Sequence, residues 1–209
     1  MANVGPVPPQ HQQEIRNSVS VKVALLGDSN IGKTSLMTKY VNTSYDSAYK
    51  KTMGVNYMEK NIELGTTDIK FLIYDVGGSR EFQNMISLAT NDAVALIFTF
   101  DLTRKDTLDN LREWYRLARI TNQTALPMLV GTKFDKFVEL PLEYQEEMHS
   151  YTQKFAKAMK SSVVFTSNSD SINVQKVFKI LISKAFDLQL TIPEITNVGE
   201  PLLIYNITE

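Results

Sequence analysis

The sequence predicts one α/β domain, a mostly parallel, six-stranded sheet with helices on both faces. Three observations support this prediction. Short apolar segments alternate with segments of helical period, Gly65-Thr66-Thr67 joins two strand-like segments as in a hairpin, and residues 93–100 form a continuous apolar run. Such a run is typical of a strand buried on both faces. Ligands of these sheets bind beyond the carboxyl ends of the strands, so function is expected in the loops there.

Each expected element follows from its own pattern of apolar residues. We expect strands at 20–26, 57–64, 68–74, 93–100, 127–130 and 163–165. We expect helices at 33–41, 103–120, 144–160 and 173–187. On these helices Trp114 should be a half-buried packing residue and His149 should be solvated, like His11 near the N-terminus.

These elements place one folded domain at 19–188, with a segment on either side. Residues 1–18 are rich in Pro and Gln and have little to bury, so we expect a disordered tail. Residues 189–209 form a C-terminal extension that is too apolar for a solvated tail. The extension should fold back on the domain or dock on a partner, and we favour partial packing on the domain.

Composition excludes several classes of protein. The chain has 22 basic and 23 acidic side chains and no cysteine, so it has no disulfide scaffold, zinc–thiolate site, prenyl group or palmitoyl group. Ala2 stands where N-myristoylation requires glycine. The even charge balance gives no global field for nucleic acid, and no apolar run approaches a membrane span. We therefore expect a soluble, cytoplasmic protein with no nucleic-acid partner and no direct lipid anchor.

The first strand leads directly into a phosphate-binding motif. Residues 27–34 read GDSNIGKT, which fits G-x-x-x-x-G-K-[ST] between a strand and a helix. In this motif backbone N–H groups surround a phosphate, Lys33 neutralises phosphate oxygens and the Thr34 hydroxyl can bind Mg²⁺. The alternative is a Gly-rich turn with a surface lysine. The predicted phosphate-binding residues are Ser29, Asn30, Ile31, Gly32, Lys33, Thr34 and Ser35.

Two further loops follow strands of the predicted sheet. Asp75 begins the motif D-x-x-G, in which the carboxylate organises Mg²⁺ and the N–H of Gly78 can approach a γ-phosphate. Thr132-Lys133-Phe134-Asp135 follows another strand, and the Asp135 carboxylate matches the two adjacent donors of a guanine ring. Adenine would leave this carboxylate unpaired. The alternatives are a helix cap for the first loop and a surface turn for the second.

Together these loops resemble those of the Ras-like small GTPase family over about residues 19–188. The resemblance implies the P-loop small GTPase fold, with GTP or GDP and Mg²⁺ as ligands. It implies that Thr52 joins Thr34 and Asp75 at the metal, and that Tyr45 and Tyr49 lie near the nucleotide. Ser167 and Asn168 correspond to the loop whose backbone contacts the guanine oxygen.

Segments outside these loops are most similar to the septum-promoting, mitotic-exit GTPases of fungi and their relatives. They are 54–60, 101–105, 113–116, 130–133, 155–159, 171–176, 184–188, 192–195 and 197–203. That subfamily also has T-K-x-D in place of N-K-x-D and no C-terminal lipidated cysteine. The resemblance implies a switch in cytokinesis at spindle poles or centrosomes, where the GTP form recruits a protein kinase. It also implies a two-component GTPase-activating protein that supplies an arginine and a glutamine in trans.

One departure from the family pattern concerns catalysis. Ser79 replaces the glutamine that orients the attacking water, so Lys33, Gly78 and Ser79 form a catalytic set from which slow intrinsic hydrolysis is expected. Two alternatives stay open. A binding module could hold GTP with little or no turnover, and a P-loop nucleotide kinase would need an arginine-rich lid, whereas residues 76–82 contain one basic residue.

Overall fold

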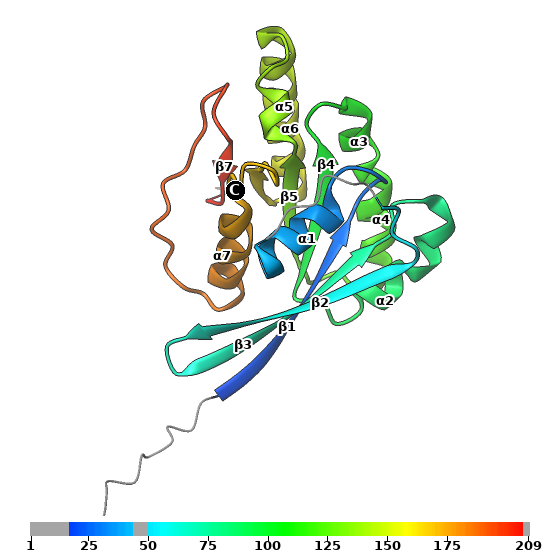
Figure 1. Cartoon of the computed structure of the whole chain (residues 1–209), viewed down its shortest axis with the longest axis vertical. Helices are drawn as coiled ribbons and strands as arrows, with labels where there is room; N and C mark the ends of the chain where they lie inside the picture. The colour runs from blue at the N-terminus through cyan, green and yellow to red at the C-terminus, as the bar shows by residue number, and fades with distance from the viewer. Residues whose placement is uncertain (1–16, 44–49, 207–209) are drawn as a thin grey trace, which may run out of the picture.

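The computed structural model describes residues 17–43 and 50–206, which form a seven-stranded sheet between two layers of helices (Figure 1). The strand order is β2-β3-β1-β4-β5-β6-β7, and the two edge strands β2 and β7 are antiparallel to their neighbours. The strands are β1 (Asn17–Leu26), β2 (Val55–Leu64), β3 (Thr67–Val76), β4 (Ala95–Asp101), β5 (Leu126–Thr132), β6 (Ser162–Phe165) and β7 (Leu203–Ile204). The α/β prediction is therefore confirmed, with one strand more than expected.

Two apolar cores lie on the two faces of the sheet. Helices α1 (Lys33–Asn42) and α7 (Val174–Ala185) cover one face. The helices that cover the other are α2 (Ile86–Thr90), α3 (Lys105–Asp109), α4 (Leu111–Thr121), α5 (Phe134–Phe137) and α6 (Leu142–Met159). A 3₁₀ helix, η1 (Arg80–Met85), precedes α2. The run 95–101 is buried along its whole length in β4, as a strand covered on both faces must be.

Some boundaries and exposures differ from the predictions. Strand β1 begins at Asn17, inside the predicted tail 1–18, because β3 is long enough to pair with these first residues. The predicted helix 103–120 is divided into α3 and α4. Trp114 is buried rather than half-buried. The prediction that His149 is solvated is wrong: only 7% of its surface is exposed, and its ring packs edge-on against Phe165.

The C-terminal extension packs on the domain. In Figure 1 the orange-to-red segment loops outward beside α7 and returns to the sheet edge, where β7 pairs with β6. The side chains of Leu202 and Leu203 are fully buried, one in each apolar core. The backbone N–H of Phe165 donates to the carbonyl oxygen of Leu202 at 2.7 Å. The extension therefore supplies the seventh strand.

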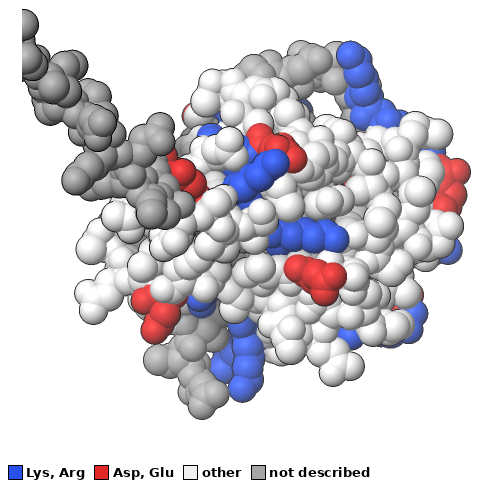
Figure 2. Space-filling view, turned by 90° about the horizontal axis from the view of Figure 1, so that it is seen from below, with Lys and Arg blue, Asp and Glu red and all other residues white. Residues whose placement is uncertain are grey.

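The described surface shows no separation of charge on the face in Figure 2, where acidic and basic side chains lie scattered among uncharged ones. Among the helices of residues 17–43 and 50–206, none has both the length and the apolar composition that crossing a membrane requires.

Candidate functional site

The loops with predicted chemistry meet at one edge of the sheet. Strands β3, β1, β4, β5 and β6 are parallel neighbours, so their carboxyl ends lie at the same edge. Gly27 follows β1, Asp75 lies near the end of β3, Thr132 ends β5 and Ser167 follows β6. These loops can therefore act on one ligand.

The loop after β1 has the backbone that a phosphate-binding loop needs. Gly27 has a φ of 136°, and a Cβ atom there would lie 2.2 Å from the carbonyl oxygen of Thr99. Gly32 has a φ of 92° and is the N-cap of α1. No side chain caps this helix, so the N–H groups of its first turn remain for an anion at the positive end of the helix dipole.

Lys33 lies inside this loop. Only 5% of its surface is exposed, and its Nζ donates to the carbonyl oxygens of Gly27 at 2.9 Å and Asp28 at 2.7 Å. Burial lowers the pKa of Lys33, and the charges of Asp75 and Asp28 partly oppose this. An ammonium group has three donors, and these two carbonyls occupy two of them. A buried cation held by its own loop is well placed to bind phosphate.

The residues predicted to bind metal converge. The Thr34 hydroxyl donates to Oδ2 of Asp75 and lies 2.9 Å from the Thr52 hydroxyl, which lies 3.3 Å from the same carboxylate oxygen. Asp75 is fully buried, and its Oδ1 has no hydrogen-bond partner among the described residues. Burial raises the pKa of Asp75, against the opposing charge of Lys33. Two hydroxyl oxygens beside a buried carboxylate oxygen make three hard ligands that fit Mg²⁺.

These three residues would not complete the coordination of a metal ion by themselves. The part of the chain described by the structure contains no group of three or more His, Asp or Glu side chains suited to a metal. A Mg²⁺ ion held by Thr34, Thr52 and Asp75 would need further oxygens from phosphate and water, which is the usual arrangement for this ion at phosphate sites.

The segment after Asp75 lies directly against the phosphate-binding loop. The N–H of Gly77 donates to the carbonyl oxygen of Gly54 at 2.7 Å, which joins the two segments that flank the metal residues. A Cβ atom on Gly78 would lie 2.2 Å from the backbone of Asp28 and Ser29, so no larger residue fits there. The hydroxyls of Ser79 and Ser29 lie 3.3 Å apart. Gly78 and Ser79, two of the three residues predicted to be catalytic, therefore lie against the predicted phosphate-binding loop.

The predicted base-binding residues come from two loops, which hydrogen bonds join to each other and to the phosphate-binding loop. The Thr132 hydroxyl lies within hydrogen-bond distance of the carbonyl oxygens of Ile31 and Phe100. The Ser167 hydroxyl donates to Oδ1 of Asp135 at 2.7 Å, which fixes the orientation of that carboxylate. Nδ2 of Asn168 donates to the carbonyl oxygen of Gly32 at 3.1 Å.

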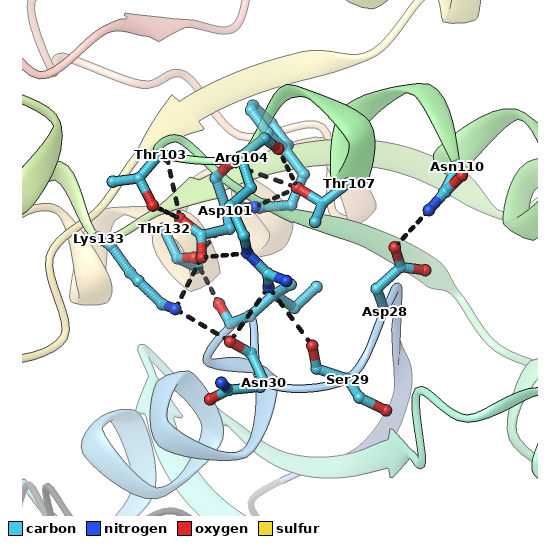
Figure 3. Close-up of polar contacts among 12 residues, drawn as sticks. Asp28, Ser29, Asn30, Asp101, Thr103, Arg104, Thr107, Asn110, Thr132 and Lys133 are labelled. Atoms are coloured by element: carbon cyan, nitrogen blue, oxygen red, sulfur yellow. Dashed lines mark hydrogen bonds and ion pairs between the residues drawn. The ribbon is translucent and has the colours of Figure 1, made fainter. Parts of the chain in front are cut away.

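Asp101 and Arg104, at the end of β4 and in the loop after it, join this site although they were not among the predicted site residues (Figure 3). Asp101 is 1% exposed and its Oδ2 lies 2.7 Å from Nζ of Lys133 and 3.1 Å from Nε of Arg104. Burial alone would raise the pKa of Asp101, but hydrogen bonds from Lys133 and Thr103 outweigh it and lower the pKa. The sequence offered one signal for Asp101: like Asp75, it is a polar residue at the end of a buried strand.

Asp28 makes a second set of contacts that the sequence did not predict. Its carboxylate accepts a hydrogen bond from Nε1 of Trp114 at 2.9 Å and one from Nδ2 of Asn110 at 2.7 Å. These bonds attach the phosphate-binding loop to α4, as Figure 3 shows for Asn110. Nothing in the local pattern around Trp114 indicates this role. Tyr45 and Tyr49, also predicted to lie near the nucleotide, fall outside the described residues.

Comparison with known proteins agrees with this geometry. The family model "Ras family" matches residues 22–187. Septum-promoting GTP-binding protein 1 of Schizosaccharomyces pombe is 56% identical over 91% of this chain and 96% of its own length. The Ras-related protein RABC1 of Arabidopsis thaliana is 31% identical over 79% of this chain and 77% of its own. GTP-binding protein ypt1 of S. pombe is 29% identical over 75% of each chain. The chain therefore belongs to the Ras family and is a small GTPase.

Proposed function

We propose that this protein is a Mg²⁺-dependent GTP/GDP switch that controls septation. The observation that carries the proposal is the meeting of Thr52 with Thr34 and Asp75. Thr52 lies in the segment before β2, so a metal-bound triphosphate would order that segment and hydrolysis would release it. The 56% identity to a septum-promoting GTP-binding protein supports septation as the process.

Each residue of the site has a distinct part in the proposal. The N–H groups of 29–35 and the Lys33 ammonium bind the phosphates, and Gly78 brings its N–H to the γ-phosphate. Thr34, Thr52 and Asp75 hold the metal. Bound Mg²⁺ would neutralise charge on the phosphate oxygens. Thr132, Lys133, Asp135, Ser167 and Asn168 form the base site. The hydrogen bond from Ser167 supports this assignment, because it orients the Asp135 carboxylate.

Turnover should be slow without a partner. Ser79 has a short hydroxyl in place of the amide that would orient the attacking water, and this hydroxyl already lies beside Ser29. We infer that a GTPase-activating protein of the two-component type supplies both an arginine and a glutamine. The same serine favours a second candidate, a module that holds GTP with little hydrolysis. In either case we infer that the GTP form recruits a protein kinase on a scaffold at the spindle pole or centrosome.

The test of the base site is Asp135→Asn. This change reverses one donor–acceptor pair, so GTP preference should fall by at least about 10²-fold while xanthine nucleotides gain. Equilibrium binding of GDP and xanthosine diphosphate is measured in excess Mg²⁺. The matched control is Asp170→Asn, an exposed aspartate in the neighbouring loop. If Asp135→Asn keeps full GDP affinity, the proposed base site is wrong.

A further inference from the structure

The carbonyl groups of the phosphate-binding loop all have side-chain partners. Those of Gly27 and Asp28 accept from Lys33, and that of Gly32 accepts from Asn168. Between them, the carbonyls of Ser29, Asn30 and Ile31 face donors from two other loops: Arg104, Lys133 and Thr132. Side chains therefore hold the loop through its carbonyl groups, and the N–H groups of the loop remain for a ligand.

Among the donors from the other loops, Arg104 is the one that contacts two carbonyls of the phosphate-binding loop. Its Nη2 lies 3.5 Å from the carbonyl oxygen of Ser29 and 3.4 Å from that of Asn30. Both distances are long for hydrogen bonds, so attraction between the cation and the two carbonyl dipoles supplies much of the interaction. The buried Asp101 carboxylate fixes the guanidinium from the opposite side through Nε. Figure 3 shows Arg104 between Asp101 and the two carbonyls.

The geometry of the peptide bond relates these carbonyls to the N–H groups that would bind a ligand. In a trans peptide the C=O and the following N–H point in opposite directions. The carbonyls of Ser29 and Asn30 therefore belong to the peptide units whose N–H groups are those of Asn30 and Ile31. A cation against the carbonyls fixes both units and strengthens their dipoles toward an anion on the other side.

We propose that Arg104 is a positioning residue for the β-phosphate of the bound nucleotide. Held by Asp101, it orients the N–H groups of Asn30 and Ile31 and adds a positive charge behind them. This inference rests on the proposed nucleotide site but adds a residue outside the motifs that define it. Its effect should fall mainly on the β-phosphate, because Arg104 lies against the carbonyls of Ser29 and Asn30.

The test compares Arg104→Gln and Arg104→Lys with wild type in Mg²⁺. The matched control is Arg116→Gln, which removes an exposed arginine whose partner is Glu113 on its own helix. The release rate of a fluorescent GDP analogue and the equilibrium affinities for GDP and GMP are measured. Unfolding temperatures of the nucleotide-free proteins report on the fold.

Arg104→Gln should speed GDP release roughly 5- to 20-fold, as expected for loss of a partly exposed charged donor, while GMP affinity changes less than about twofold. Arg104→Lys should recover part of the loss, and Arg116→Gln should match wild type. Unchanged GDP release, or equal weakening of GDP and GMP, overturns the role of Arg104. Failure of wild type to bind GDP overturns the proposed nucleotide site itself, and with it this inference.

Discussion

Leu202 offers the clearest test of whether the C-terminal extension is part of the folded domain. Its side chain is fully buried in the core formed with α2 to α6, next to the two-residue strand β7. Its carbonyl oxygen accepts the hydrogen bond from the Phe165 N–H, which a side-chain substitution leaves in place. Leu202→Ala therefore removes packing without removing the pairing.

The expected cost follows from complete burial. Leucine-to-alanine changes in a protein core cost about 2–5 kcal/mol, the sum of lost transfer free energy and the cavity left behind. Taking about 3 kcal/mol, the unfolding temperature of a chain of this length should fall by roughly 6–12 °C. Such a loss is a large part of the roughly 5–15 kcal/mol that stabilises a typical domain.

The assay is urea unfolding at one fixed GDP concentration, because a bound ligand adds to stability. Val198→Ala is the matched control: it lies in the same extension, is 38% exposed and should change the unfolding free energy by about 0.5 kcal/mol or less. If Leu202→Ala costs no more than Val198→Ala, the extension does not contribute to the core and the structural reasoning fails.

Two further predictions concern catalysis and pH. Ser79→Gln should raise the rate of intrinsic single-turnover GTP hydrolysis by about tenfold or more, because it restores an amide that can orient water. The rate with an activating protein should stay nearly unchanged. An unchanged intrinsic rate would show that Ser79 is not limiting. Burial lowers the pKa of His149 below 6.5, against a hydrogen bond to the backbone of Thr196, so the unfolded chain takes up the proton more readily than the folded one. The unfolding free energy should therefore fall from pH 7.5 to 5.5, and by less in His149→Gln; an equal fall in both proteins would assign the pH dependence to other groups.

The sequence predicted the parts of the fold that local pattern determines. Apolar runs identified six of the seven strands of the sheet, and the hairpin signal correctly placed the antiparallel pair β2 and β3. Strand β7 could not be found this way, because two residues show no period and their partners Val163 and Val164 lie about forty positions earlier. The prediction for His149 was wrong although the helical pattern around it indicated burial. Buried residues of α6 recur at helical spacing, and His149 lies among them.

In the site, too, the local patterns could be predicted from the sequence and the long-range contacts could not. The phosphate-binding loop could be predicted because its glycines and Lys33 lie in one contiguous motif of a few residues. The contacts from other loops to its carbonyls join residues separated by 74 to 136 positions, such as Arg104 with Asn30 and Asn168 with Gly32. No local pattern encodes such pairs, although the strand-end position of Asp101 was a usable signal.

The long-range contacts also bear on the threonine of the T-K-x-D motif. The Thr132 hydroxyl faces two carbonyl oxygens, those of Ile31 and Phe100, and has one hydrogen to donate. An asparagine amide at this position would carry two hydrogens, one for each carbonyl. Thr132 therefore holds the phosphate-binding loop with fewer donors than the amide of N-K-x-D would supply. Arg104 contacts the next two carbonyls toward the N-terminus, and Asp101 fixes it in place. Arg104 therefore places a cation on the same stretch of backbone that Thr132 holds with a single hydrogen.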